Sequence, residues 1–182
     1  SSVTRVSDLL GRITRRPEDS PTGAERPIRV ARAAEIARRT RAHTLVELGS
    51  GSSEKTRLLL DSLQAAGTLR EFVPLDVSEA ALRDAVAGLS ADYRTLAIHG
   101  VVGDFTEHLG RIPGQTPRIV AFLGGTIGNL FPDERAVFLA AVRETLADGE
   151  WLLLATALVK APDALLPALC DRAGGPAELH RN

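Results

Sequence analysis

A glycine-rich turn is the part of the sequence whose residue types best suit a ligand. Residues 45–48 are mostly apolar, Gly49 and Gly51 follow them, and polar residues then lead into a helical pattern. Because glycine has no Cβ, its backbone can turn sharply and lie against a ligand, and free amides at the start of a helix attract a carboxylate or phosphate. Lys55 follows the turn, where its ammonium group could neutralise a ligand carboxylate. The pattern predicts a ligand site at Gly49, Gly51 and Lys55; the alternative is that the glycines only turn the chain.

The turn lacks two common phosphate-binding patterns. It has no Gly-Lys-Ser/Thr ending, and a dinucleotide fingerprint would need a third glycine near position 54, where Glu54 stands. A strand end reading Glu-x-Gly-x-Gly, followed by an acidic residue at the next strand end, instead suits a ligand with an amino-acid tail and a ribose. S-adenosylmethionine has this shape, and we expect it to be the cofactor.

Two acidic residues at later strand ends extend the predicted site. Asp76 lies about 25 residues after Gly51, close to the spacing at which an acid accepts hydrogen bonds from both hydroxyls of a ribose. The alternative is a helix cap near Ser78. Asp104 precedes Phe105, and this pair suits adenine, since a carboxylate can accept from the exocyclic amine while a ring packs on the base. Here the alternative is another helix cap beside a core phenylalanine.

A second glycine-rich loop, residues 124–129, ends in Asn129, whose amide offers both a donor and an acceptor. A turn residue in the left-handed conformation is the alternative. The sequence has no His or Cys pair at metal spacing, no nucleophile elbow and no paired carboxylates, so we expect no metal and assign no catalytic residue. Methyl transfer fits this absence, because a sulfonium methyl group is already activated and mainly needs an aligned, unprotonated nucleophile.

Alternating strand and helix patterns must position these residues. Strands are predicted at 44–48, 71–77, 96–102, 118–123 and 151–157, and helices at 28–41, 53–66, 78–90, 132–146 and, as a helix or turn, 105–110. With right-handed crossovers, this order gives an α/β fold with a doubly wound, Rossmann-like parallel sheet. Ligands in such sheets bind at the carboxyl ends of the strands, where all the predicted site residues should lie.

Composition fits one globular domain with an uneven charge distribution. The 182 residues are 44% hydrophobic and 25% charged, and the net charge of −1 argues against general affinity for nucleic acid or anionic membranes. We predict a basic helical N-terminal segment over residues 1–42, with ten Arg against five acidic residues, and a cofactor-binding Rossmann-like domain over residues 43–182. The arginines are interpreted as a solvated helix face; an arm that recruits RNA is the alternative.

One cysteine, Cys170, cannot form an internal disulfide, which fits a reducing cytoplasm. No apolar run approaches the roughly 20 residues that cross a bilayer, and the first residues show no signal-peptide pattern. We therefore expect a cytoplasmic protein that does not enter a membrane.

Three segments, residues 45–56, 122–130 and 158–160, resemble the histidine-specific, S-adenosylmethionine-dependent methyltransferases of ergothioneine biosynthesis. The resemblance extends over roughly residues 8–182. It implies a class I methyltransferase fold and trimethylation of the α-amine of L-histidine, with hercynine as the product. It also implies that the cofactor is bound by Gly49, Lys55, Asp76, Asp104 and Phe105, and the histidine by Gly124 and Asn129.

The sequence departs from the family pattern at three positions. Asp19 stands in a segment where family members carry tyrosines, Cys170 replaces another tyrosine, and Ala157 replaces an aspartate. Family members also continue for well over a hundred further residues. Without them we expect the sheet to lack its last strands, leaving strand 151–157 as an apolar edge that a further segment or partner chain completes. A second hypothesis is an inactive cofactor-binding paralogue or fragment that acts through a partner.

Overall fold

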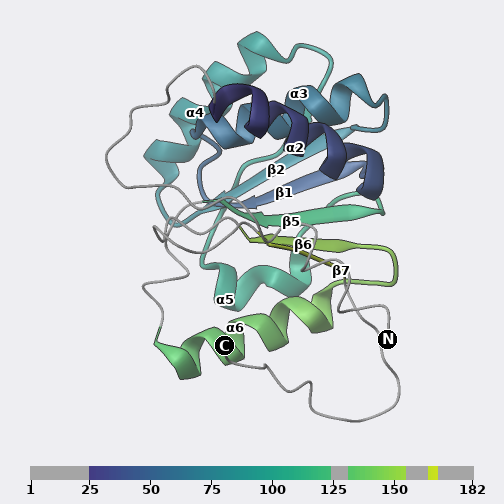
Figure 1. Ribbon diagram of the computed structural model, residues 1–182. Helices are drawn as coiled ribbons and strands as arrows, with labels where there is room; N and C mark the ends of the chain where they lie inside the picture. The colour runs from purple at the N-terminus through teal and green to yellow at the C-terminus, as the bar shows by residue number, and fades with distance from the viewer. Residues whose placement is uncertain (1–24, 124–130, 155–163, 168–182) are drawn as a thin grey trace, which may run out of the picture.

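The alternating patterns produce one sheet with helices on both faces (Figure 1), in a computed structural model that describes residues 25–123, 131–154 and 164–167. The strands are β1 (Thr44–Leu48), β2 (Glu71–Asp76), β3 (Ala97–Ile98), β4 (Val101–Val102), β5 (Arg118–Phe122), β6 (Trp151–Leu154) and β7 (Ala164–Pro167). Their order is β3-β2-β1-β5-β6-β7, and β4 also pairs with β2. All pairs are parallel except β6 with β7. The chain therefore moves outward in opposite directions from β1 and β5, which is the doubly wound arrangement predicted from the sequence.

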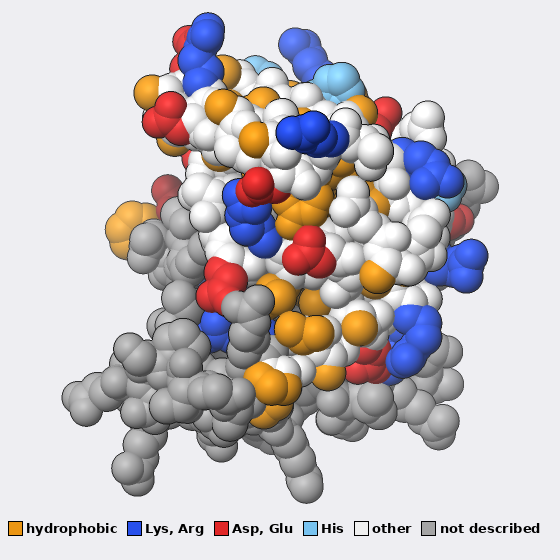
Figure 2. Space-filling model, turned by 90° about the horizontal axis from the view of Figure 1, so that it is seen from above, with side chains coloured by type: hydrophobic (Ala, Val, Ile, Leu, Met, Phe, Trp, Pro, Cys, Tyr) orange, Lys and Arg blue, Asp and Glu red, His pale blue; other side chains and the backbone are white. Residues whose placement is uncertain are grey.

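Two layers of helices cover the sheet. The helices are α2 (Glu25–Thr40), α3 (Glu54–Ala65), α4 (Glu79–Asp92), α5 (Phe105–His108), the short 3₁₀ helix η1 (Leu109–Arg111) and α6 (Pro132–Thr145). Figure 1 shows α2, α3 and α4 on one face and α5 and α6 on the other. Seen from the α2–α4 side, the basic and acidic side chains of the described residues are interspersed (Figure 2), so these residues form no single-sign patch of the kind that favours nucleic acid.

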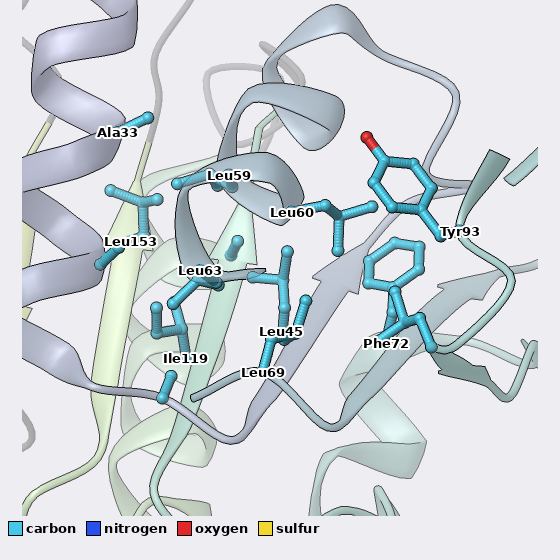
Figure 3. Close-up of a cluster of buried hydrophobic side chains, with 14 of the residues drawn as sticks. Ala33, Leu45, Leu59, Leu60, Leu63, Leu69, Phe72, Tyr93, Ile119 and Leu153 are labelled. Atoms are coloured by element: carbon cyan, nitrogen blue, oxygen red, sulfur yellow. The ribbon is translucent and has the colours of Figure 1, made fainter. Parts of the chain in front are cut away.

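The central strands are apolar on both faces, so each contributes to two cores. Leu45 of β1 packs with α2 and α3, whereas the next residue, Val46, packs with α6. Figure 3 shows the first core, where leucines of α3 lie over Leu45, Phe72 and Ile119 of the sheet. Each fully buried Leu, Ile or Phe contributes about 1.5–3 kcal/mol by leaving water. This burial on both faces fixes the strands and thereby the position of their carboxyl ends.

Side-chain caps define where the helices of the first layer begin. Ser53 Oγ accepts a hydrogen bond from the Thr56 amide at 3.1 Å and begins α3, and Ser78 Oγ accepts from the Ala81 amide at 3.2 Å and begins α4. Gly67 follows α3 with a positive φ of 76°, a backbone conformation that glycine adopts readily just after a helix. The helix starts next to the carboxyl edge are thus fixed by local bonds.

A buried ion pair closes the opposite, amino end of the sheet. Arg118 Nε and Nη2 donate to the two carboxylate oxygens of Glu150 at 2.7 and 3.0 Å, and the Ala147 amide donates to Glu150 Oε1 at 2.9 Å. Burial alone would raise the pKa of Glu150, but the hydrogen bonds from Arg118 and the Ala147 amide outweigh it and hold that pKa below its ordinary value. The carboxylate of Glu150 is therefore compensated by the fold itself.

Two details of the sheet differ from the prediction. The strand predicted at 96–102 is interrupted, because His99 and Gly100 separate β3 from β4. The expectation that strand 151–157 is an unpaired edge is wrong: β7 pairs antiparallel with β6, placing Leu165 opposite Leu153. A partner chain is therefore not needed to cover β6.

Helix α2 packs as part of the first core. Ala33 and Ala37 are buried in it, while Arg38, Arg39 and Arg41 are exposed. This is the solvated helix face expected for the arginines. The boundary predicted at residue 42 stays a prediction.

Candidate functional site

Three of the predicted site residues lie at the carboxyl ends of neighbouring strands. The Gly49 amide donates to the Leu75 carbonyl at 2.7 Å, which places the end of β1 beside the end of β2. Asp76 pairs with Val102 of β4, and the Gly103 amide donates to the Asp76 carbonyl at 3.0 Å, so Asp104 follows directly. The structure therefore gathers Gly49, Asp76 and Asp104 at one edge of the sheet. Their roles in binding stay predictions.

The turn after β1 requires glycine at two positions, for different reasons. Gly49 has a φ of +151°, and an added Cβ would meet only the side chain of Glu47 at 4.0 Å, so its backbone conformation is the constraint. Gly51 has a φ of +81°, and an added Cβ would lie 2.9 Å from the Phe72 ring and 3.2 Å from Glu47 Oε2. The turn is thus held against the underlying side chains, and α3 begins directly after it.

Glu47 lies beneath this turn and is the residue that the sequence pattern left without a role. Its side chain is only 3% exposed, Oε1 accepts a hydrogen bond from Thr56 Oγ1 at 2.7 Å, and the buried Oε2 has no partner among the described residues. Burial raises the pKa of Glu47 from its ordinary value of 4.5 to about 7; the hydrogen bond from Thr56 opposes this shift and the charge of Asp76 adds to it. The available signal was an acidic residue inside an otherwise apolar strand.

Asp76 is half-buried and held by the backbone that follows it. Its Oδ1 accepts a hydrogen bond from the Ser78 amide at 2.9 Å, and Ser78 rather than Asp76 caps α4. The alternative interpretation of Asp76, a helix cap, is therefore met only in part: Asp76 bonds the turn before α4, and Ser78 caps the helix. The ribose contact of Asp76 stays a prediction.

Asp104 and Phe105 lie differently from each other. Asp104 is exposed at the edge, and its carbonyl accepts from the Glu107 and His108 amides, both at 3.1 Å. The Phe105 ring is half-buried and packs edge-on against Phe122 and Phe138, with centroid distances of 5.5 and 5.0 Å. The ring therefore belongs to the second core, which is the alternative named for it from the sequence, and its predicted packing on adenine is limited to the part that remains exposed.

Lys55 is half-buried in the first turn of α3, beside the glycine turn. Gly124 and Asn129, predicted to contact the substrate, lie outside the described residues. In the described ranges, no three His, Cys, Asp or Glu side chains are grouped so that they could hold a metal ion. No helix in those ranges combines the length and the apolar character needed to cross a membrane.

The edge combines features that suit a zwitterionic ligand with a ribose. The amino terminus of α3 offers amides to a carboxylate, and Lys55 adds a positive charge there. Glu47 beneath the turn and Asp76 beside it offer negative charge to a cationic group and acceptors to hydroxyls. The arrangement can bind and orient such a ligand.

The chain resembles known proteins in both sequence and fold. The sequence matches the profile of the family described as "Histidine-specific methyltransferase, SAM-dependent" over residues 5–182. A histidine N-alpha-methyltransferase from Mycolicibacterium smegmatis is 51% identical over 97% of this chain and 55% of its own length. Ergothioneine biosynthesis protein 1 from Neurospora crassa is 28% identical over 71% of this chain and 15% of its own length. The crystal structure of the small RNA methyltransferase HEN1 superposes with a TM-score of 0.56 at 22% identity, covering 79% of this chain and 18% of that one, and shows a shared fold.

The chain spans about half the length of the curated relatives it matches: 55% for the enzyme from Mycolicibacterium smegmatis and 55% for a histidine N-alpha-methyltransferase from Mycobacterium tuberculosis. The family profile, in contrast, matches nearly all of it. The chain belongs to the family of histidine-specific, SAM-dependent methyltransferases.

Proposed function

We propose that the chain binds S-adenosylmethionine at the carboxyl edge of its sheet and takes part in methylation of the α-amine of L-histidine to hercynine, a step of ergothioneine biosynthesis in the cytoplasm. The observation that carries the proposal is the gathering of the glycine turn, Asp76 and Asp104 at one edge, in a chain of this family. The names of the relatives that match the chain support the histidine substrate and the pathway.

The residues at the edge fit the cofactor on two structural observations. Gly51 lies so close to Phe72 and Glu47 that any side chain would displace them, so the turn after β1 packs directly on these two side chains and its bare backbone can lie against a ligand. Glu47 holds a buried carboxylate oxygen without a partner under the same turn, so a cationic ligand would compensate a charge that the described residues leave uncompensated.

Each residue of the edge has a separate task in this proposal. The amides at the start of α3 and the ammonium of Lys55 receive the carboxylate of the amino-acid tail. Asp76 accepts hydrogen bonds from the ribose hydroxyls, and Asp104 accepts from the adenine amine. Together they fix the orientation of the ligand along the edge.

When bound, S-adenosylmethionine supplies a methyl group on a positively charged sulfur. Gly124 and Asn129 are proposed to hold histidine so that its α-amine faces this methyl group. Orientation is the main contribution that such a site makes, because aligning two reactants is worth up to about 7–11 kcal/mol of the barrier. The amine must be unprotonated, so activity should rise as pH approaches the pKa of the substrate amine.

The test is incubation of the chain with S-[methyl-¹⁴C]adenosylmethionine and histidine, followed by chromatography of the products. Labelled hercynine supports the proposal, and the matched variants Asp76→Asn and Asp84→Asn separate a site acid from an exposed acid on α4. Transfer that survives Asp76→Asn unchanged would contradict the assigned role of Asp76.

A cofactor-binding paralogue or fragment without catalysis is the second candidate, favoured by Asp19, Cys170 and Ala157, which stand where the family pattern has two tyrosines and an aspartate. Calorimetry separates the two functions. Binding of both cofactor and histidine supports the enzyme, whereas cofactor binding without histidine binding or transfer supports the binding module.

A further inference from the structure

Glu47 is as fully buried as a core residue, but the hydrogen bonds of its carboxyl group are incomplete. Its side chain is 3% exposed, and Oε2 has no hydrogen-bond partner in the part of the chain that the structure describes. Leaving a buried carboxylate oxygen unpaired is costly, and most buried polar groups in proteins avoid it. This oxygen therefore requires a physical explanation.

The unpaired oxygen lies under the glycine turn. A Cβ added to Gly51 would be 3.2 Å from Glu47 Oε2 and 2.9 Å from the Phe72 ring, so both groups touch the underside of this residue. Phe72 is fully buried and apolar. A charge in such surroundings is weakly screened and acts strongly on a ligand lying on the turn.

The neighbouring strands give Glu47 no cation. Its partners in register are Pro74 of β2 and Ala121 of β5, neither of which is charged. On α3, Thr56 faces it and donates the one hydrogen bond to Oε1. The described residues therefore compensate only one of the two oxygens.

The charged groups at the same edge of the sheet are of mixed sign. Asp76 at the end of β2 disfavours its ionisation, and Glu54 and Lys55 occupy the first turn of α3. Burial, the largest effect, and Asp76 together raise the pKa of Glu47 to about 7, although Thr56 opposes the shift. Near neutral pH the protonated and ionised forms of Glu47 are thus similarly populated, and an added positive charge would shift Glu47 to the ionised form.

We propose that Glu47 is a charge-sensing positioning residue, which holds a proton in the free site and is ionised when the positively charged cofactor lies on the glycine turn. The O–H bond of the carboxyl group breaks on binding, and the proton passes to the solvent. Because S-adenosylhomocysteine has lost the positive charge on sulfur, ionised Glu47 favours the cofactor over this product. The inference rests on the proposed function, which seats the cofactor on this turn.

The proposal fixes the direction of the pH dependence. Below pH 7 a proton must leave Glu47 before the cationic ligand is fully stabilised, so the affinity for S-adenosylmethionine should fall about tenfold from pH 8 to pH 6. The affinity for S-adenosylhomocysteine should fall less over the same range. Loss of the positive charge on sulfur then favours release of the product.

Isothermal titration calorimetry of the chain with each ligand at pH 6, 7 and 8 tests this directly. Titrations in buffers of different ionisation enthalpy count the protons released on binding, which is a readout independent of catalysis. Glu47→Gln keeps an acceptor for the Thr56 hydroxyl but cannot ionise, so its affinity for S-adenosylmethionine should lose the Glu47 part of the pH dependence. Any slope from other groups remains in this variant.

Thr56→Val is the matched second variant. It removes the hydrogen bond that lowers the pKa of Glu47, so the midpoint of the pH dependence should move to higher pH. A purely structural role for Glu47 would change affinity by the same factor at every pH and leave no midpoint to move. Circular dichroism melts confirm that both variants are folded before titration.

Three results would overturn the proposal: an unchanged slope in Glu47→Gln, equal slopes for the two ligands, or an unmoved midpoint in Thr56→Val. Failure of the unaltered chain to bind either ligand at any pH would be recognisably different. It would refute the proposed cofactor site, and this inference with it.

Discussion

Replacing Gly51 with alanine tests whether the turn is held against the side chains beneath it. The φ of +81° is unfavourable for alanine by about 1–2 kcal/mol. The new Cβ would also lie 2.9 Å from Phe72, which is fully buried and has little room to move. Forcing an extra methyl group into a packed core costs about 1–3 kcal/mol. The expected loss in the free energy of unfolding is therefore about 2–5 kcal/mol.

Gly149→Ala is the matched control, because Gly149 has nearly the same φ, +82°, but an added Cβ there meets no atom within 4 Å. Only the backbone cost applies, about 1–2 kcal/mol. Gly149 precedes β6 at the opposite end of the sheet, so this change should leave cofactor binding intact. The difference between the two variants isolates the contact with Phe72.

Urea denaturation followed by circular dichroism measures both losses, and calorimetry measures the binding of S-adenosylmethionine. Adding Phe72→Leu to Gly51→Ala should recover part of the loss, giving a double variant at least about 1 kcal/mol more stable than the sum of the single changes predicts. Equal losses for Gly51→Ala and Gly149→Ala, together with additive energies, would refute the close contact between the turn and Phe72.

Three further predictions concern other groups. Ser53→Ala removes the cap of α3 and should lower the free energy of unfolding by about 1 kcal/mol in the same urea assay; no loss would contradict the cap. Glu150→Gln breaks the buried pair with Arg118 and should lower the free energy of unfolding by about 3 kcal/mol at pH 7. Because the pKa of Glu150 is lowered in the folded protein, its carboxylate stabilises the fold only while it is ionised, so this loss should shrink as the pH falls below about 4. For Glu47, whose pKa is raised to about 7, the folded protein retains a proton that the unfolded chain has lost, so stability should fall as the pH rises. This fall should be about 3 kcal/mol between pH 5 and pH 8, should be absent in Glu47→Gln, and would be contradicted by parallel pH curves.

Local patterns were sufficient to predict most of the fold. The predicted strand at 44–48 coincides with β1, and the predicted helix at 53–66 differs from α3 by one residue at each end. Both elements have strong local signals, an apolar run and a serine cap that leads into a helical repeat. The gathering of Asp76 and Asp104 at one edge followed from the parallel order of these strands, without knowledge of any side-chain contact.

Features that depend on pairing between distant segments could not be predicted from local sequence patterns. The run 96–102 is mostly apolar, but pairing with β2 includes only Ala97, Ile98, Val101 and Val102. The pairing of β7 with β6 depends on where the chain brings β7, which no periodic pattern within residues 164–167 indicates. Phe105 follows a plausible ligand-binding acid, yet its ring direction is decided by Phe122 and Phe138, which come from distant parts of the chain.

The two buried acids of the sheet suggest why the carboxyl edge is left incomplete. Glu150, at the amino end, receives two guanidinium hydrogen bonds and two backbone amides, so the fold itself compensates its charge. Glu47, at the carboxyl end, receives one hydroxyl and keeps one oxygen unpaired. Stability alone would favour compensation at both ends, since a buried acid without a cation must either carry an uncompensated charge or keep its proton. The uncompensated acid lies under the turn where a cationic ligand is proposed to bind, so the missing charge is the one that the ligand brings.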